Sequence, residues 1–343
     1  MMIDLRSDTV TKPTPEMLKA MFNAKVGDDV FKEDPTILEL EQKTADLFGM
    51  EAGLFCPSGT MTNQLAIKAH TQPGDELLCD ATSHVYNYEV GGISFHSGVQ
   101  AKLLPGKNGI ITTEQIHHAI NPDFDWLPPT KLVCIENTAN RAGGTYYTLL
   151  QMQELSATCR KSKLKFHLDG ARIFNALVEL NIQPKELGPL FDSISVCLSK
   201  GLGAPVGSVL LGNKDWIKTC RRYRKLFGGG MRQAGYLAAA GIYALDNNVN
   251  RLKDDHQRAT TLASVLEKLS FVESILPVKT NIVIFNLKQE VNPVTFVDLL
   301  KQKGIIISAF GHQAVRLVTH LDFTDDMLAN VIMALKDIEV EMK

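Results

Sequence analysis

The chain has 343 residues, of which 45% are hydrophobic and 22% charged, so it can bury a large core and is not intrinsically disordered. Its 36 basic and 38 acidic residues leave a formal net charge of −2, which argues against nucleic acid or an anionic membrane surface as partner. A chain of this length favours one large domain plus a smaller one, and the charge balance favours a small molecule as ligand.

The amino-terminal residues lack the basic region and apolar core of a secretion signal. No segment approaches the ~20 apolar residues of a membrane span. We therefore expect a cytoplasmic protein. The six cysteines form no Cys-x-x-Cys pair and are expected to be reduced core thiols.

The first 36 residues are expected to form an arm that carries an acidic active-site loop at 27–35, rather than a packed element. Thr36, with Glu39 three positions later, is typical of the N-cap of a helix that ends at Gly49. The compact part of the chain is predicted to begin with this helix.

Apolar segments of strand length then alternate with helix-like segments, a pattern typical of a parallel sheet. We predict an α/β fold with a mainly parallel sheet flanked by helices, forming a large domain over residues 37–246. A first strand turns at Pro57 and Gly59 into a helix. The further expected strands are 76–79, 131–135, 164–168, 193–198 and 208–211.

Residues 234–245 are apolar nearly all round, which indicates a helix that is buried or packed on a partner subunit. An amphipathic helix over 251–269 is expected to connect two domains. The pattern then changes, so residues 247–343 are predicted to form a smaller α+β domain. Its expected strands are 281–287, 305–308 and 315–319, and its expected helices are 293–303 and 325–343.

Lys200 follows the apolar run of the strand at 193–198 and precedes the chain-breaking residues Gly201, Gly203 and Pro205. Its ammonium group is therefore expected at the carboxyl edge of the sheet, where ligands bind in open α/β folds. A lysine desolvated there can form a Schiff base with a carbonyl compound. The alternative is a solvated surface lysine.

Asp169 ends its own predicted strand 31 residues before Lys200, which is one βαβ unit away. A carboxylate at this position can hold the ring nitrogen of pyridoxal phosphate, and Arg172 can approach the phenolate oxygen of that cofactor. The alternative is an Asp that caps the next helix and pairs with Arg172.

Gly59 and Thr60 stand at the start of a helix, where backbone N–H groups can bind a phosphate, although an ordinary βα turn has the same sequence pattern. Arg232, behind a run of three glycines, can add charge to that phosphate site, in its own or a second subunit. His84 lies among polar and aromatic residues and can stack on a flat ring, or be a structural histidine. Arg316 on its strand can hold a carboxylate, or face solvent. The histidine and cysteine spacing predicts no metal site.

Several motifs together make the chain similar to the low-specificity L-threonine aldolases, and this resemblance spans nearly its whole length. The motifs are Leu5-Arg-Ser-Asp-Thr-Val-Thr11, Gly27-Asp-Asp-Val, Asp34-Pro-Thr, Glu136-Asn-Thr, Asp169-Gly-Ala-Arg172, Cys197-Leu-Ser-Lys-Gly-Leu-Gly203, Gly228-Gly-Gly-Met-Arg-Gln233 and Val315-Arg-Leu-Val-Thr-His320.

The resemblance implies the aspartate-aminotransferase-like fold, pyridoxal 5'-phosphate as cofactor, and a homotetramer of two catalytic dimers with active sites at the dimer interface. It also implies reversible cleavage of β-hydroxy-α-amino acids to glycine and an aldehyde. Catalysis would fall to Lys200, which carries the cofactor, to Asp169 on the ring nitrogen and to His84 on the ring face. Gly59, Thr60, Arg172 and Arg232 would complete the cofactor site, and Ser7, Arg172 and Arg316 would hold the substrate carboxylate.

Two positions depart from the pattern of the resembled family. Ala139 stands where that family usually has a histidine near the substrate hydroxyl, and Phe31 where it usually has a tyrosine. Because alanine cannot transfer a proton, Ala139→His is expected to raise the cleavage rate or to alter the preference between threonine and allo-threonine.

The residues leave other readings open. Lys200, Asp169 and the phosphate-binding groups suit any pyridoxal-phosphate enzyme, including another lyase or an aminotransferase. Ala139 also suits a weakened homologue that only binds the cofactor or a partner.

Overall fold

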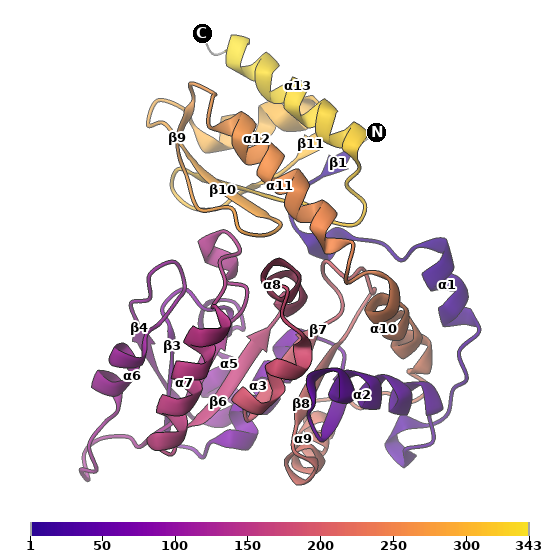
Figure 1. Cartoon of the computed structure of the whole chain (residues 1–343), viewed down its shortest axis with the longest axis vertical. Coiled ribbons are helices and arrows are strands. Elements are labelled where there is room, and N and C mark those ends of the chain that lie inside the picture. The colour runs from indigo at the N-terminus through magenta and orange to yellow at the C-terminus, as the bar shows by residue number, and fades with distance from the viewer. Residues whose placement is uncertain (1, 342–343) are drawn as a thin grey trace.

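The computed structural model describes residues 2–341. This part of the chain forms three sheets, of seven, four and two strands, and the four-stranded sheet lies above the seven-stranded one (Figure 1). The larger sheet has seven strands in the order β2-β8-β7-β6-β5-β3-β4. Its strands are β2 (Ala52–Cys56), β3 (Glu76–Asp80), β4 (Gln100–Leu104), β5 (Thr130–Glu136), β6 (Lys165–Gly170), β7 (Ser193–Cys197) and β8 (Ser208–Gly212).

The sheet is mainly parallel, as predicted. Every pairing from β4 through β7 is parallel, whereas β8 runs antiparallel to both β7 and β2. The connection from β7 to β8 holds no helix. Without a crossover element the chain can only return antiparallel. The edge strands β4 and, in the small sheet, β9 (Val272–Ile275) were not predicted, because both are short and interrupt their apolar residues with polar ones.

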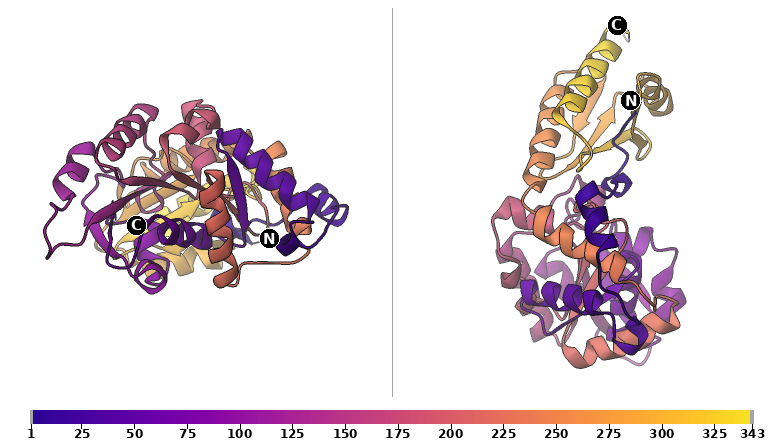
Figure 2. Two further views of the ribbon diagram at one scale, coloured as in Figure 1. Left: turned by 90° about the horizontal axis from the view of Figure 1, so that it is seen from below. Right: turned by 90° about the vertical axis from the view of Figure 1, so that its right-hand side faces the viewer.

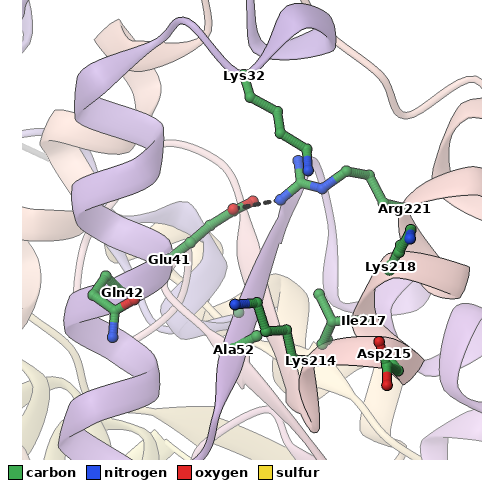
Figure 3. A pocket seen from close by; sticks show the side chains of 10 residues that line it. Lys32, Glu41, Gln42, Ala52, Lys214, Asp215, Ile217, Lys218 and Arg221 are labelled. Atoms are coloured by element: carbon green, nitrogen blue, oxygen red, sulfur yellow. Dashed lines mark hydrogen bonds and ion pairs between the residues drawn. The ribbon is translucent and has the colours of Figure 1, made fainter.

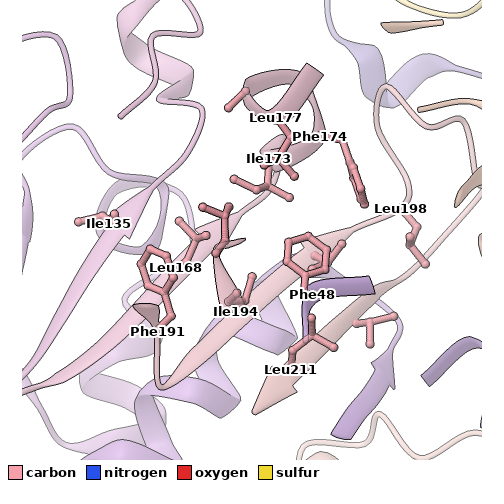
Figure 4. Packing of buried hydrophobic residues seen from close by; sticks show 14 of the residues in the cluster. Phe48, Ile135, Leu168, Ile173, Phe174, Leu177, Phe191, Ile194, Leu198 and Leu211 are labelled. Atoms are coloured by element: carbon pink, nitrogen blue, oxygen red, sulfur yellow. The ribbon is translucent and has the colours of Figure 1, made fainter. Parts of the chain in front are cut away.

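Helices cover both faces of the large sheet. Side chains of α2, α7, α8 and α10 pack on one face with alternate strand residues, including Ile135, Leu168 and Ile194 (Figure 4). The intervening residues face α3, α5 and α9. These helices and their neighbours are α1 (Pro15–Phe22), α2 (Pro35–Phe48), α3 (Gly59–His70), α4 (His84–Asn87), α5 (Gly92–Ser97), α6 (Thr113–Ala119), α7 (Leu149–Lys161), α8 (Ile173–Leu180), α9 (Lys214–Leu226) and α10 (Gly235–Asn247).

The start of α2 differs from the prediction. Asp34, not Thr36, is the N-cap, and its carboxylate accepts the N–H groups of Thr36 at 3.2 Å and Ile37 at 3.1 Å. Pro35 fills the first helical position, where its missing N–H costs nothing. Asp34 also accepts the N–H of Gly235 at 2.8 Å, so one carboxylate joins α2 to α10.

The small sheet is antiparallel, in the order β12-β13-β10-β9. The predicted strand 305–308 is split, because β11 leaves this sheet to pair elsewhere. The predicted helix 325–343 is described as far as residue 341; its last two residues lie outside the described part. The remaining elements are β10 (Ile282–Leu287), β11 (Ile305–Ile306), β12 (Ser308–Ala309), β13 (Ala314–Val318), α11 (Leu252–Leu266), α12 (Pro293–Gln302) and α13 (Asp325–Glu341).

The expectation of an unpacked arm is wrong for the first residues. Strand β1 (Ile3–Asp4) pairs in parallel with β11. Leu5 is fully buried in the core formed by the small sheet and helices α11 to α13, here called the upper body. The alternation of Ile3 and Leu5 provides the apolar side chains for this contact. Both ends of the described chain therefore lie in the upper body (Figure 2).

All six cysteines are free and buried. Between residues 2 and 341, no helix combines the length and apolar character needed to span a membrane.

Candidate active site

Lys200 follows β7 at the carboxyl edge of the sheet, as predicted. Its carbonyl accepts the N–H of Gly203 at 2.8 Å, and the N–H of Ala204 reaches back to Leu198 at 3.1 Å. Gly203 has a φ of 77°, a conformation that glycine adopts without strain. This tight turn keeps Lys200 beside the sheet, where its side chain is half-buried.

Asp169 lies on the neighbouring parallel strand, with its Cα opposite Ser195 of β7. It is 2% exposed. One carboxylate oxygen accepts the N–H of Ala171 at 3.1 Å and the other accepts Nδ2 of Asn63 at 2.9 Å. The ion pair with Arg172 that the structural alternative required is absent from the described contacts of Asp169.

His84 lies close to Asp169, and the carboxylate of Glu89 contacts His84 beside it. His84 Nδ1 lies 3.0 Å from Oε1 of Glu89, and ligand atoms of His84, Glu89 and Asp169 all lie within 4.8 Å of one another. Burial lowers the pKa of His84, but the Glu89 hydrogen bond and the charge of Asp169 outweigh it and raise that pKa, while the charge of Lys200 opposes the rise. His84, Asp169 and Lys200 thus share one electrostatic environment.

Glu136, at the end of β5, fixes the backbone on two sides of this cluster. Its oxygens accept the N–H of His84 at 2.9 Å and of Asn140 at 3.0 Å. Burial and the neighbouring charge of Asp169 raise the pKa of Glu136 to about 7.

Arg172 binds Asp8 rather than Asp169. Its Nε and Nη2 each donate a 2.7 Å hydrogen bond to the Asp8 carboxylate, and both side chains are buried. Burial by itself raises the pKa of Asp8, but the charges of Arg172 and Lys200 lower it to about 2. Ser7 precedes this carboxylate, and its hydroxyl lies 3.5 Å from it. The amino-terminal segment therefore enters the site.

Arg316 also points into the site instead of facing solvent. Its Nη1 donates to Oδ1 of Asn140 at 3.0 Å, and Nη1 of Arg172 approaches the same oxygen at 3.4 Å. Nε of Arg316 is buried without a hydrogen-bond partner among the described residues. Burial and the charge of Arg172 lower the pKa of Arg316 to about 10. Two guanidinium groups with an unused donor suit a carboxylate ligand.

The predicted phosphate-binding residues are only partly brought together. Gly59 and Thr60 are the first residues of α3, after the N-cap Ser58. The hydroxyl of Ser208, buried and without a partner among the described residues, lies beside Gly59. Arg232 instead pairs with Asp28 at 2.9 Å and has a 55% exposed side chain. The N–H groups at the start of α3, the Ser208 hydroxyl and Asp169 fit a pyridine ring that carries a phosphate.

The two departures from the expected pattern lie in different surroundings. Ala139 is buried, and a Cβ on Gly109 would approach its methyl group to 2.6 Å. The loop that holds Gly109 therefore occupies the space beside Ala139. Phe31, in contrast, ends the turn 29–31 of the acidic loop and is 69% exposed.

The sequence prediction missed Asp8, Asn63, Glu89 and Asn140. Asp8 stands inside the motif Leu5 to Thr11, and Asn140 lies two residues beyond the motif Glu136-Asn-Thr, so these motifs pointed to the two residues without assigning their roles. Asn63 had a readable signal: it is the middle of three consecutive polar residues, Thr62-Asn63-Gln64, on a helix expected to pack on a sheet. All three are buried.

A cavity of about 390 Å³ lies apart from these residues, between α2 and α9 along the outer edge of β2 (Figure 3). An ion pair of 2.5 Å between Arg221 and Glu41 crosses it. Glu41 also accepts the N–H of Phe55 at 2.8 Å. These contacts protect the free edge of the sheet.

Comparison with known proteins gives consistent matches. The family model described as beta-eliminating lyase matches residues 4–290. The chain is 42% identical over 331 residues to the low specificity L-threonine aldolase of Escherichia coli (strain K12), covering 96% of this chain and 97% of that protein. A solved threonine aldolase from Leishmania major superposes with a TM-score of 0.84 at 20% identity, covering 98% and 99% of the two chains. A putative L-allo-threonine aldolase from Listeria monocytogenes EGD-E gives 0.82 at 19% identity, covering 99% and 96%.

Proposed function

This chain belongs to the beta-eliminating lyase family, within its low-specificity L-threonine aldolases, and on that premise we propose that it cleaves L-threonine, L-allo-threonine and related β-hydroxy-α-amino acids to glycine and an aldehyde. The observation that carries the proposal is the placement of Lys200 and Asp169 at the ends of adjacent parallel strands, with His84 beside them. Pyridoxal 5'-phosphate, when bound there, supplies the electron sink that the cleavage of Cα–Cβ needs.

The chain's own residues divide the work of holding that cofactor. Lys200 would form the covalent link, Asp169 would hold the ring nitrogen and His84 would lie against the ring. Arg172 would face the phenolate side. Gly59 and Thr60, at the start of α3, would bind the phosphate. Arg232 is assigned to the same phosphate, and within its own chain it pairs with Asp28.

The substrate carboxylate is bound by Arg316 and Arg172, with Ser7 beside them. Support comes from the amide oxygen of Asn140, which both guanidinium groups already contact, and from the unused Nε of Arg316. A carboxylate that replaces the Asn140 contact gains charge-assisted hydrogen bonds. It thereby fixes the orientation of Cα toward the sheet edge.

We also propose that the protein is a homotetramer with active sites at the dimer interfaces and that it is located in the cytoplasm. Beside His84, the segment after α4 exposes the large apolar side chains Tyr88 and Val90, the latter 99% exposed, and the acidic loop exposes Phe31. Such side chains are stabilised by a second copy of the chain. We assign residues 1–36 to an amino-terminal segment with the active-site loop, 37–246 to the cofactor domain and 247–343 to the small domain. Sedimentation of the purified protein tests the assembly.

The experiment that tests the activity measures acetaldehyde released from L-threonine and from L-allo-threonine, without any 2-oxo acid. An aldolase releases acetaldehyde and glycine in equal amounts from at least one of them. An aminotransferase requires a 2-oxo acid as acceptor. A protein that binds pyridoxal phosphate yet releases no aldehyde from either substrate would contradict the proposed activity.

A further inference from the structure

A line of buried polar side chains leads away from Asp169 beneath α3. Asn63 donates through Nδ2 to Oδ2 of Asp169 and to Oε1 of Glu89, both at 2.9 Å. Its Oδ1 lies 3.1 Å from Nε2 of His167. The reverse amide orientation would place an oxygen against two carboxylates, so the contacts determine the orientation of Asn63.

This orientation determines the protonation of every group behind Asn63. His167 must carry its proton on Nε2 to donate to Asn63, so its Nδ1 accepts the hydroxyl of Ser193 at 2.8 Å. The Ser193 oxygen in turn accepts Nε2–H of His70 at 2.8 Å. Burial lowers the pKa of both histidines to about 3, which leaves each imidazole neutral.

The spacing in the sequence explains why these groups meet. His167 and Asp169 are two residues apart on β6 and therefore share a face of the sheet. Asn63 and His70 are seven residues apart on α3, two helical turns along one side. Ser193 begins β7 opposite His167. The helix side thus lies over the strand face along its length.

We propose that His70, Ser193, His167 and Asn63 form a one-way series of hydrogen-bond donors that holds the side chains of Asp169 and Glu89 in fixed orientations, with Asn63 as the positioning residue. The inference rests on the proposed function, because Asp169 is assigned there to the cofactor ring. Two buried carboxylates repel each other, and a shared donor that cannot turn offsets part of that repulsion. Loss of the donor removes the hydrogen bond that fixes the Asp169 carboxylate, so the carboxylate is held less well toward the ring nitrogen.

The first test compares two amide substitutions. Asn63→Leu removes the shared donor. The control, Asn121→Leu, removes an amide that donates at 3.0 Å to Glu76, the first residue of β3, at the opposite edge of the sheet from Asp169. Asn63→Leu is expected to raise the Kd of pyridoxal phosphate about 10- to 100-fold, the usual worth of a hydrogen bond to a charged group. Asn121→Leu should leave that Kd near the parent value. Equal Kd values for Asn63→Leu and the parent would overturn the proposal.

The second test reaches one step further from Asp169 and is independent of whether Asn63→Leu folds. His167→Gln keeps an N–H donor toward Asn63, whereas His167→Phe keeps only the bulk. His167→Phe is expected to weaken cofactor binding more than His167→Gln. Equal weakening by both would show that cofactor binding depends on the volume of the His167 ring and not on its N–H donor. That result would overturn the proposal.

Nitrogen NMR of the histidine-labelled holoenzyme reports directly which ring nitrogen of each histidine carries a proton. The His167→Gln variant identifies the signals of His167. The expected result is a protonated Nε2 and an unprotonated Nδ1 at His167, unchanged between about pH 5 and 8. The opposite tautomer, or titration in that range, would refute the inference. If the parent protein does not bind pyridoxal phosphate at all, the proposed function fails. If the parent binds it and both sets of variants bind it equally well, only the proposed series of hydrogen bonds is refuted.

Discussion

Asp8 and Arg172 form a two-pronged ion pair across 164 residues of sequence, with both hydrogen bonds at 2.7 Å. The pair joins the amino-terminal segment to the end of β6. Asn281, the residue before β10, adds a third hydrogen bond to the same carboxylate at 3.2 Å. One buried carboxylate thus connects the amino-terminal segment, the large sheet and the small sheet at the active site.

Replacement of Asp8 by Asn is expected to destabilise the protein. It leaves Arg172 buried without an anion, and a broken buried ion pair costs about 3–5 kcal/mol. Urea unfolding measures the loss. Asp4→Asn is the matched control, because its partner Arg6 is 51% exposed and such pairs contribute at most about 1 kcal/mol. Similar losses for the two variants would contradict the role given to Asp8.

The substrate-carboxylate assignment predicts a KM effect at Arg316. Arg316→Lys removes the planar fork while keeping the charge, so KM for threonine should rise about 10-fold or more with a smaller change in kcat. Arg141→Lys is the control, because the guanidinium groups of both arginines lie over the ring of Phe310, at 4.3 and 4.4 Å. An unchanged KM in Arg316→Lys would remove this residue from the substrate site.

Much of the fold could be predicted because its signals are local. Apolar segments bounded by glycine, proline and polar residues mark β5 to β8, and the motifs that end β6 and β7 place Asp169 and Lys200 at one edge. The partners of these residues could not be predicted. Asp8, Asn63 and Asn140 meet the site only through tertiary packing, from segments that local patterns leave unconnected.

The split of the predicted strand 305–308 has the same origin. Its first residues pair with β1 and its last with β13. Both halves have ordinary strand composition, so the sequence pattern cannot divide them. The distant partner strands decide the division.

Ala139→His tests the missing histidine against the packing found around Ala139. The new side chain must displace the loop at Gly109, and such overpacking typically costs about 1–3 kcal/mol. We expect lower stability and a changed ratio of activity on L-threonine and L-allo-threonine. Ala139→Leu supplies bulk without a proton. If Ala139→His matched the parent enzyme on both substrates, or Ala139→Leu produced the same change, proton handling at this position would be excluded.

The buried histidines predict acid sensitivity. The pKa values of His70 and His167 are lowered from 6.5 to about 3 by burial, so the unfolded chain binds their protons at a pH where the folded protein does not. Stability should therefore fall as pH decreases from 6.5 toward 3, by about 1.4 kcal/mol per pH unit for each histidine. His167→Phe should remove one of the two contributions. Urea midpoints measured across this range would contradict the account if the two proteins had the same pH dependence.

The most direct test of the central claim is borohydride reduction of the cofactor-bound protein, followed by peptide mapping. The account predicts that the yellow colour is lost and that one pyridoxyl group is attached to Lys200, with no label at that peptide in Lys200→Ala. A label on another lysine, or a colourless protein that does not respond to added pyridoxal phosphate, would contradict it.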